Sequence, residues 1–355
     1  MKKVAIIGTQ GVPAQYGGFE SLVENIIGDN CSADIAYTVF CSGLDKDNRL
    51  KTYKGCRLKY VPLHANGIQS IPYDMLSMLR ALRGYDTLLI LGTSGCLLLP
   101  FLKILTRSKI VINIDGLEHR REKWGKVARW VLRHSEQMAV RYADVIIADN
   151  KGISDYVTET YGKSSEVIAY GGDNAVRQVS EERQEEVLRH YQVERDNYAV
   201  TVCRIEPENN THIVLEAFRH TGRPLVYVGN WDHSAYGRSL KKEYCHAANI
   251  RMVDSVYDLD VLYALRSNAH CYIHGHSAGG TNPSLVEAMS IGCRVLAYDV
   301  VYNRETTYGK ALYFKDAESL IALLDTDWGD YSELREIALQ HYTWTTIAKQ
   351  YEKLY

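Results

Sequence analysis

The chain has 355 residues, of which 46% are hydrophobic and 24% are charged, and its formal net charge is −2. This length exceeds the usual size of a single hydrophobic core, so we expect two domains. The charge balance argues against broad nucleic-acid binding, and we expect no nucleic-acid partner.

The cysteines and the apolar runs bear on the compartment. Eight cysteines are scattered without a CxxC pair or zinc-ligand spacing, which favours reduced thiols in a cytoplasmic protein. A strand-like run follows Met1 and two lysines directly, so we expect no signal peptide. The longest apolar run, residues 95–105, contains Pro100 and Lys103 and is too short to span a bilayer. We therefore expect any membrane contact to be peripheral.

Short apolar, β-branched runs alternate with helical patterns through the first half of the chain. The expected strands are residues 4–7, 35–40, 58–61, 87–91, 110–114, 145–148 and 165–169. Fully apolar strands between helices predict a parallel sheet covered on both faces. We therefore expect a doubly wound α/β domain over residues 1–170.

A Gly-rich turn follows the first expected strand. It contains Gly8, Gly11, Gly17 and Gly18 and runs into Glu20 and a helix. Such a turn lets a phosphate approach the backbone, although the glycines could serve only a tight turn. The spacing is not GxGxxG, and the second strand ends in Cys-Ser rather than in an acidic residue, which argues against a nicotinamide cofactor.

The segment after the fifth strand of this domain combines acidic and basic groups. Asp115, Glu118 and His119 follow the strand, where a carboxylate could orient an acceptor hydroxyl or cap the next helix. Basic residues and tryptophans interleave over residues 120–134, which suits the surface of an anionic membrane. The alternative is a solvated helix whose aromatic side chains pack into the core.

The α/β pattern restarts after residue 170, with expected strands at residues 198–203, 225–228, 250–253, 270–273 and 294–298. We therefore expect a second Rossmann-like domain over residues 171–342. The terminal helix, residues 343–355, carries four large apolar side chains at helical spacing and is expected to pack back on the first domain. Ligands of such sheets bind beyond the carboxyl ends of the strands, which predicts a site in a cleft between the domains.

Two segments of the second domain predict a diphosphate site. Arg204 follows the domain's first strand, and its forked, permanent charge suits a diphosphate, although it could be a solvated surface residue. The segment 276–289, HSAGGTNPSLVEAM, places a Gly-rich turn before a helix and so predicts a phosphate cradle. In it Glu287, expected in the first turn of the helix, could bind a ribose or merely face the helix dipole. His276 could be a core residue or could contact a sugar.

Three acidic pairs have D-x-D spacing, at residues 45/47, 258/260 and 325/327. A metal-dependent transferase would use such a pair on a divalent ion. Because these pairs precede helices or lie in polar turns, we interpret them as caps. We expect no metal and no other cofactor.

The GGFE turn, RIEPENN and PSLVEAM together resemble the retaining GT-B glycosyltransferases of family 4 over the whole chain. The longer strings GTQGVPAQYGGFE, DGLEHRREKW, CRIEPENN, VGNW and HGHSAGGTNPSLVEAM resemble a bacterial subgroup of capsule and O-antigen rhamnosyltransferases. The resemblance implies a GT-B fold, which consists of two Rossmann-like domains. It also implies transfer of a hexosyl group from a dTDP- or UDP-sugar, dTDP-L-rhamnose above all, to a lipid-diphosphate-linked sugar at the inner face of the cell membrane.

The resemblance also assigns roles to single residues. The family's diphosphate arginine is Arg204, its lysine position holds Asn209, and its two glutamates fall on Gly279 and Glu287. The expected catalytic residues are Arg204, Asp115, Glu118 and His276. The expected donor-binding residues are Gly17, Gly18, Arg204, Asn209, Gly280, Thr281, Asn282, Leu285 and Glu287. The expected acceptor-binding residues are Glu20, Asp115, Glu118 and His119. The expected membrane-facing residues are Arg120, Arg121, Lys123, Trp124, Lys126 and Trp130.

Two other functions fit the same motifs. One is a GT-B nucleotide-sugar 2-epimerase, which would turn over a donor without an acceptor. The other is a non-catalytic nucleotide-sugar-binding partner of a polysaccharide assembly complex, because the family's lysine and first glutamate are absent here.

Overall fold

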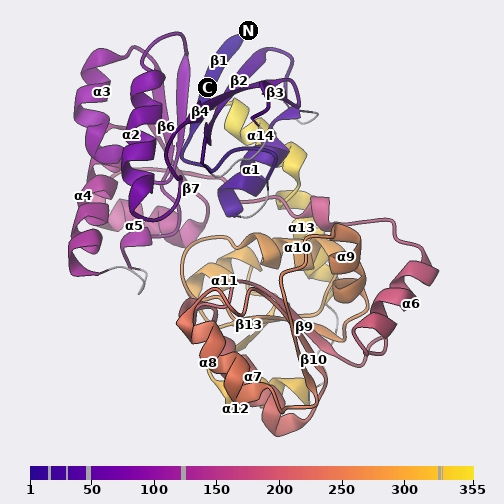
Figure 1. The fold of residues 1–355 in the computed structure, drawn as a ribbon. Helices are drawn as coiled ribbons and strands as arrows, with labels where there is room; N and C mark the ends of the chain where they lie inside the picture. Colours follow the sequence, from indigo (N-terminus) through magenta and orange to yellow (C-terminus); the bar gives the residue numbers. More distant parts are fainter. Residues whose placement is uncertain (15–16, 29–30, 45–48, 121–124, 327–328, 330) are drawn as a thin grey trace. The chain divides into compact units, whose positions relative to one another are not determined.

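The computed structural model describes residues 1–355 except 15–16, 29–30, 45–48, 121–124, 327–328 and 330. The chain divides into two compact units (Figure 1). Unit 1 comprises Met1–Tyr170 and Trp344–Tyr355, and unit 2 comprises Gly171–Thr343.

Unit 1 is built on one eight-stranded sheet with the order β3-β4-β2-β1-β5-β6-β7-β8. Every neighbouring pair is parallel except β3 and β4. The strands are β1 (Lys2–Ile7), β2 (Ile35–Ser42), β3 (Thr52–Tyr53), β4 (Cys56–Val61), β5 (Thr87–Leu91), β6 (Lys109–Asn113), β7 (Val145–Ala148) and β8 (Glu166–Val167). All five residues of β5 are buried, as expected of a central strand covered on both faces.

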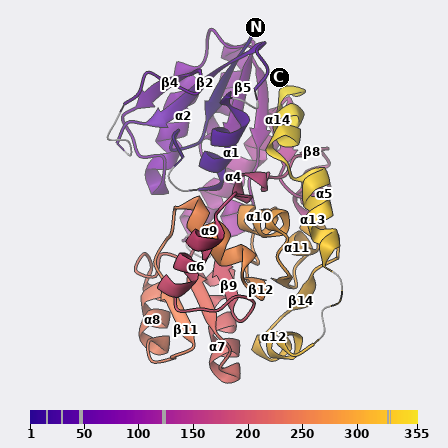
Figure 2. The same ribbon diagram turned by 90° about the vertical axis from the view of Figure 1, so that its right-hand side faces the viewer.

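The helices of unit 1 are α1 (Gly18–Ile26), α2 (Ser70–Arg80), α3 (Leu99–Leu105), α4 (Lys126–Tyr142), α5 (Lys151–Tyr161) and α14 (Trp344–Glu352), with short 3-10 turns η2 (Gly67–Gln69), η3 (Cys96–Leu98) and η4 (Glu118–Arg120). The terminal helix α14 contacts α1 (Figure 2). It buries Trp344, Ile347 and Tyr351, and the Tyr351 hydroxyl accepts a hydrogen bond from Asn113 Nδ2 at 2.9 Å. A helix from the end of the chain thus completes the core of unit 1.

Unit 2 is built on a six-stranded parallel sheet with the order β11-β10-β9-β12-β13-β14. Its strands are β9 (Ala199–Val202), β10 (Leu225–Val228), β11 (Ile250–Val253), β12 (Cys271–His274), β13 (Val295–Tyr298) and β14 (Leu312–Phe314). Its helices are α6 (Glu181–His190), α7 (Thr211–Thr221), α8 (Ala235–Tyr244), α9 (Leu259–Ser267), α10 (Pro283–Ile291), α11 (Val301–Thr306), α12 (Ala317–Leu324) and α13 (Ser332–His341), with 3-10 turns η5 (Asp173–Ala175) and η6 (Pro207–Asn209).

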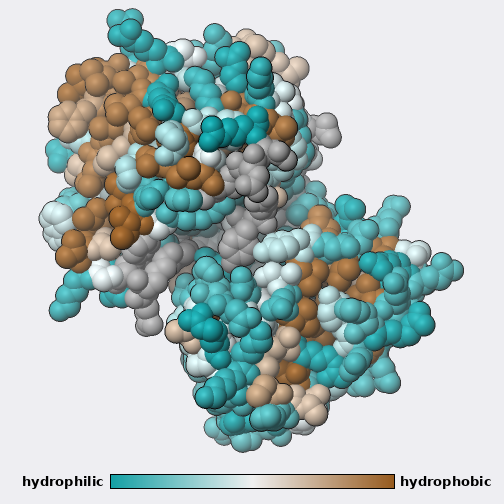
Figure 3. Space-filling view, in the orientation of Figure 1, coloured by the Kyte–Doolittle hydropathy of each residue, from teal (hydrophilic) through white to brown (hydrophobic). Residues whose placement is uncertain are grey.

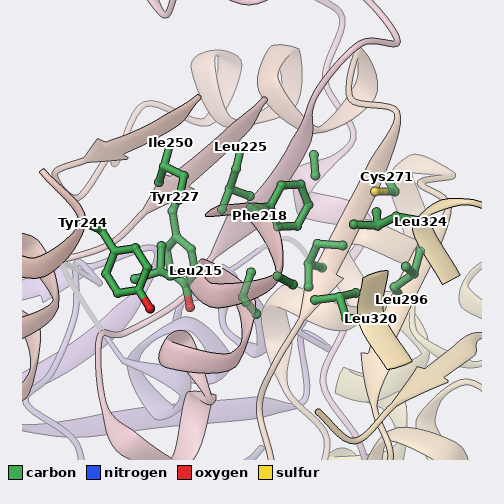
Figure 4. Close-up of a cluster of buried hydrophobic side chains, with 14 of the residues drawn as sticks. Leu215, Phe218, Leu225, Tyr227, Tyr244, Ile250, Cys271, Leu296, Leu320 and Leu324 are labelled. Carbon is green, nitrogen blue, oxygen red and sulfur yellow. The ribbon is translucent and has the colours of Figure 1, made fainter. Parts of the chain in front are cut away.

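The core of unit 2 lies between the sheet and the helices α7 and α12, which contact each other (Figure 4). Phe218 of α7, Leu225 of β10 and Leu320 of α12 are each at most 1% exposed. Burial of each such side chain contributes on the order of 2 kcal/mol to folding. This packing holds the sheet in place, including the carboxyl ends of β9 and β12, which the candidate-site loops follow.

The structure confirms the doubly wound α/β class of both units and corrects several details. The short strands β3 and β14 were not predicted, and β8 is shorter than the predicted residues 165–169. None of the eight cysteines forms a disulfide. Among the described residues no helix has both the length and the apolar character needed to cross a bilayer.

Candidate functional site

The predicted diphosphate residues lie where the strand order of unit 2 reverses. Strand β9 is the first of the unit, and the chain runs outward from it to β10 and β11 before returning to β12 on its other side. Strands β9 and β12 are parallel neighbours, so their carboxyl ends lie at the same edge of the sheet. Arg204 follows β9, and the Gly-rich segment follows β12. Ligands of open α/β sheets bind at this kind of position.

Two loops at this edge are joined by hydrogen bonds. Ser277 donates from its backbone N and its Oγ to the Glu208 carbonyl at 2.8 and 2.9 Å, and Asn210 Nδ2 donates to the Gly275 carbonyl at 2.9 Å. A Cβ at Gly275 would lie 2.2 Å from the Asn209 carbonyl oxygen, so only glycine fits there. These hydrogen bonds therefore hold the loop that contains Arg204 against the loop that follows β12.

Asn209 connects two of the predicted site residues. Its Nδ2 donates to the Arg204 carbonyl at 2.9 Å, and its Oδ1 lies 2.8 Å from His276 Nδ1. Because Oδ1 can only accept, His276 carries its proton on Nδ1. Asn209 is 2% exposed. The Asn209 amide thus holds the Arg204 backbone and the His276 ring, and its role in donor binding stays a prediction.

Arg204 itself is exposed. Within the described part of the chain its guanidinium forms no hydrogen bond or ion pair. Other exposed arginines of unit 2, such as Arg183 and Arg219, pair with acidic neighbours on their own helices. All five donors of Arg204 are therefore available to an anion.

The start of α10 offers fewer free backbone N–H groups to a phosphate than the sequence predicted. Asn282 caps the helix, with its Oδ1 accepting from Ser284 N at 3.0 Å and its carbonyl from Leu285 N at 3.0 Å. Pro283 has no N–H, and the Leu285 side chain is fully buried. The Leu285 side chain is therefore part of the core and its N–H already has a partner, while the predicted donor-binding role stays a prediction. Gly280 and Thr281, the two residues that precede the Asn282 cap, are both buried.

Glu287 does not lie in the first turn of α10, because the helix begins at Pro283. Its carboxylate pairs with Arg266 of α9, with Nη2 and Oε2 2.9 Å apart. The Arg266 side chain is 2% exposed, whereas Glu287 is 21% exposed. Glu287 thus balances a buried charge and still presents part of its carboxylate to solvent.

His274, at the carboxyl end of β12, was not predicted as a site residue. It is 2% exposed, and its Nε2 has no hydrogen-bond partner among the described residues. Burial lowers the pKa of His274 to about 3, so the ring is neutral at physiological pH. His274 is the last residue of an otherwise apolar strand, and no motif in the sequence marks it.

The Gly-rich turn of unit 1 is tied together by Glu20. Glu20 is 8% exposed and accepts hydrogen bonds from Thr9 Oγ1 at 2.9 Å and from Gln10 N at 2.7 Å. Gly17 has a φ of 120° at the start of α1, and a Cβ there would lie 2.0 Å from Glu20 Oε2. Gly18 follows as the first residue of the helix. Glu20 therefore shapes the turn, and its predicted role in acceptor binding stays a prediction.

Asp115, Glu118 and His119 follow β6, on a backbone with unusual conformations. Asp115 and Leu117 have φ values of 58° and 49°, which non-glycine residues rarely adopt. Such strain is found most often at functional sites. The Asp115 N–H donates to Asn113 Oδ1 at 3.0 Å, and Glu118 begins the 3-10 turn η4.

His119 is held by a buried carboxylate of α4. Its Nδ1 lies 2.9 Å from Glu136 Oε2, and Glu136 Oε1 accepts from the Tyr156 and Tyr161 hydroxyls at 2.8 and 2.7 Å. Burial alone would raise the pKa of Glu136, but the hydrogen bonds from His119, Tyr161 and Tyr156 outweigh it and lower the pKa. Sequence reasoning missed Glu136, although it is the one acid among residues 125–142.

The predicted membrane-facing residues are described only in part. Arg121, Lys123 and Trp124 lie outside the described residues, as does the side chain of Arg120. Helix α4 begins at Lys126, later than the predicted residue 120, and Lys126 is exposed. Trp130 is 62% exposed, so its ring does not pack into the core.

The acidic pairs that the structure describes have local partners. Asp258 caps α9 by accepting from the N–H groups of Asp260 and Val261, and Asp260 pairs with Arg177. Asp325 pairs with Arg223. Asp45, Asp47 and Asp327 lie outside the described residues. No cluster of three or more metal-ligating side chains occurs among the residues that the structure describes.

Two family models match different parts of the chain. Residues 182–318 match the family "Glycosyl transferases group 1". Residues 1–173 match a domain of unknown function, DUF1972. No curated protein sequence matches the chain.

Solved structures match the chain over its full length. Sucrose-phosphate synthase from Thermosynechococcus elongatus is 18% identical with a TM-score of 0.83, covering 100% of this chain and 98% of that one. HepE of Anabaena, solved with UDP-glucose, is 14% identical with a TM-score of 0.76 and 99% coverage of both chains. MnaA of S. aureus, solved with UDP, is 14% identical with a TM-score of 0.65, covering 100% of this chain and 98% of that one. These matches confirm the predicted GT-B fold of two Rossmann-like domains.

Proposed function

We propose that this chain is a hexosyltransferase whose donor is a nucleoside diphosphate sugar. The observation that carries this proposal is the Arg204 guanidinium, which stands without a described partner at the switch point of a glycosyl transferase group 1 domain. HepE and MnaA, which share the fold, bind UDP. A forked, permanent cation at this position matches the diphosphate that such donors share.

The proposed reaction proceeds with retention of the anomeric configuration. The bond from the anomeric carbon to the phosphate oxygen breaks, and a bond to the acceptor oxygen forms on the same face. The acceptor proton passes to an oxygen of the departing diphosphate, so no protein nucleophile is needed. Gly279, where the family has a glutamate, fits this scheme because it offers no carboxylate. Arg204 and the backbone near Gly280 stabilise the negative charge that grows on the leaving group.

The donor sugar, the acceptor and the compartment form a finer part of the proposal. We propose dTDP-L-rhamnose as the donor and a lipid-diphosphate-linked sugar of a capsule or O-antigen as the acceptor. The enzyme would act at the inner face of the cell membrane without a metal ion. The subgroup's sequence strings support this choice, as does the exposed start of α4 at Lys126 and Trp130. Asp115, Glu118 and His119 would bind the acceptor.

A thermal-shift panel of dTDP, UDP and GDP, followed by a transfer assay, tests the proposal. We expect dTDP to stabilise the protein most, and transfer from dTDP-L-rhamnose to continue in EDTA. Donor turnover without an acceptor would instead indicate an epimerase. Donor binding without transfer to any lipid-linked acceptor would indicate a non-catalytic binding protein.

A further inference from the structure

Five large apolar side chains of unit 1 lie exposed on two neighbouring helices. They are Phe101, Ile104 and Leu105 of α3, and Val127 and Trp130 of α4, and each is between 62% and 83% exposed. Helices α3 and α4 contact each other. We call these five residues the α3–α4 face. Figure 3 shows hydrophobic residues gathered over the part of unit 1 where Figure 1 places α3.

Helix α3 is apolar on both of its sides. Leu99 and Leu102 are buried in unit 1, while the three exposed residues occupy the opposite side at positions i, i+3 and i+4. A soluble helix normally carries polar residues on its outer side. An outer side of Phe, Ile and Leu therefore indicates a second apolar environment.

The charges around this face are almost all positive. Residues 95–108 and 125–142 contain six basic residues, and their one acid, Glu136, is buried. Lys103 is neutralised by Asp144, whereas Lys126 and Arg133 are exposed and form no ion pair with a described residue. The whole chain has a formal charge of −2, so this concentration of positive charge is local. An anionic surface complements it.

A hollow of about 370 Å³ adjoins the face. It is lined by Trp130, Arg133, His134 and Gln137 of α4 and by Thr160 and Tyr161 of α5. The centroids of the Trp130 and His134 rings lie 4.2 Å apart, and both residues line the hollow. The Arg133 cation, the Gln137 amide and the Thr160 hydroxyl beside an exposed indole ring suit a phosphate group at the boundary between lipid and water.

We propose that the α3–α4 face docks on a phospholipid membrane, with the outer side of α3 in the apolar layer and the basic residues of α4 on anionic headgroups. The sequence predicts membrane contact only for residues 120–130, and α3 adds the main apolar element. The idea extends the membrane part of the proposed function, but it depends on the face and not on the transfer chemistry.

Co-sedimentation with vesicles of phosphatidylcholine, with and without 30% phosphatidylglycerol, tests this proposal. Ile104→Ser/Leu105→Ser should weaken binding to vesicles of both compositions by about tenfold or more, because it removes apolar area that enters the membrane. Lys126→Glu/Arg133→Glu should remove the preference for the anionic vesicles, a loss of about tenfold or more. Leu339→Ser and Lys242→Glu, exposed residues of α13 and α8, are the matched controls and should bind like wild type.

Two outcomes would overturn the proposal. One is a failed vesicle test: wild-type protein does not sediment with anionic vesicles, or the α3 variants sediment with them as wild type does. The other is a concentration-dependent dimer, detected by analytical ultracentrifugation, that the α3 variants abolish; a second copy of the chain would then cover the face. Binding of dTDP and UDP, measured on the same variants, separates this failure from a failure of the proposed transferase.

Discussion

Each unit supports its candidate site with a buried ionised group, but the partners of that group differ. In unit 2 the buried Arg266 guanidinium, a permanent cation, pairs with the Glu287 carboxylate. In unit 1 the buried Glu136 has no permanent cation, and its partners are two tyrosine hydroxyls and the His119 ring. We therefore expect the unit 2 pair to lose stability when either charge is removed. The contribution of Glu136 in unit 1 to stability should instead depend on pH.

The largest expected effect comes from breaking the unit 2 pair. Glu287→Gln leaves the Arg266 charge buried without a counter-ion, which should lower the free energy of unfolding by about 3–5 kcal/mol. Chemical denaturation measures this loss, and Glu318→Gln on the exposed side of α12 is the control.

The double variant Arg266→Met/Glu287→Gln separates stability from binding. It removes both charges and should restore most of the lost stability. If Glu287 also binds the donor ribose, Glu287→Gln should raise the donor KM. The KM should then remain above that of wild type in the double variant, although its stability is restored. A double variant with the stability and donor KM of wild type would restrict Glu287 to a structural role.

The unit 1 network should give a smaller effect that depends on pH. Because the folded-state pKa of Glu136 is lowered, its ionised form stabilises the folded protein above the ordinary carboxyl pKa. That contribution should disappear as the pH falls through the folded-state value. Glu136→Gln should therefore cost about 1.5–3 kcal/mol at pH 7 and progressively less below about pH 4.

Unfolding of wild type, Glu136→Gln and the exposed control Glu159→Gln between pH 3 and pH 7 measures this difference. Tyr156→Phe and Tyr161→Phe should each reproduce part of it, since each removes one donor to the carboxylate. A difference that stays constant with pH would contradict the idea that charge on Glu136 matters.

The smallest expected effect sets the scale for an exposed, local interaction in unit 2. Asp258→Ala removes the two hydrogen bonds that cap α9 and should cost about 1 kcal/mol. Asp254→Ala, an exposed residue in the preceding loop, is the control and should cost almost nothing. A cap loss as large as that of Glu287→Gln would show that the buried pair is not special.

The sequence predicted the fold class because apolar strands covered on both faces leave a strong local pattern. It missed β3 and β14 because two or three residues carry no measurable period. It placed Glu287 one turn too early, although the preference of proline for the start of a helix points to Pro283. The roles of Glu136, Asn209 and Glu20 could not be predicted, because each depends on hydrogen bonds between residues that only the fold brings together.

The proposed function depends most directly on Arg204 as a diphosphate ligand. Titration calorimetry of wild type and Arg204→Ala with dTDP and dTMP isolates that interaction. Wild type should bind dTDP more tightly than dTMP, and Arg204→Ala should lose about tenfold or more in affinity for dTDP while its affinity for dTMP changes little. In the transfer assay the same variant should lose on the order of 100-fold in turnover. An Arg204→Ala protein that binds dTDP like wild type would contradict the account.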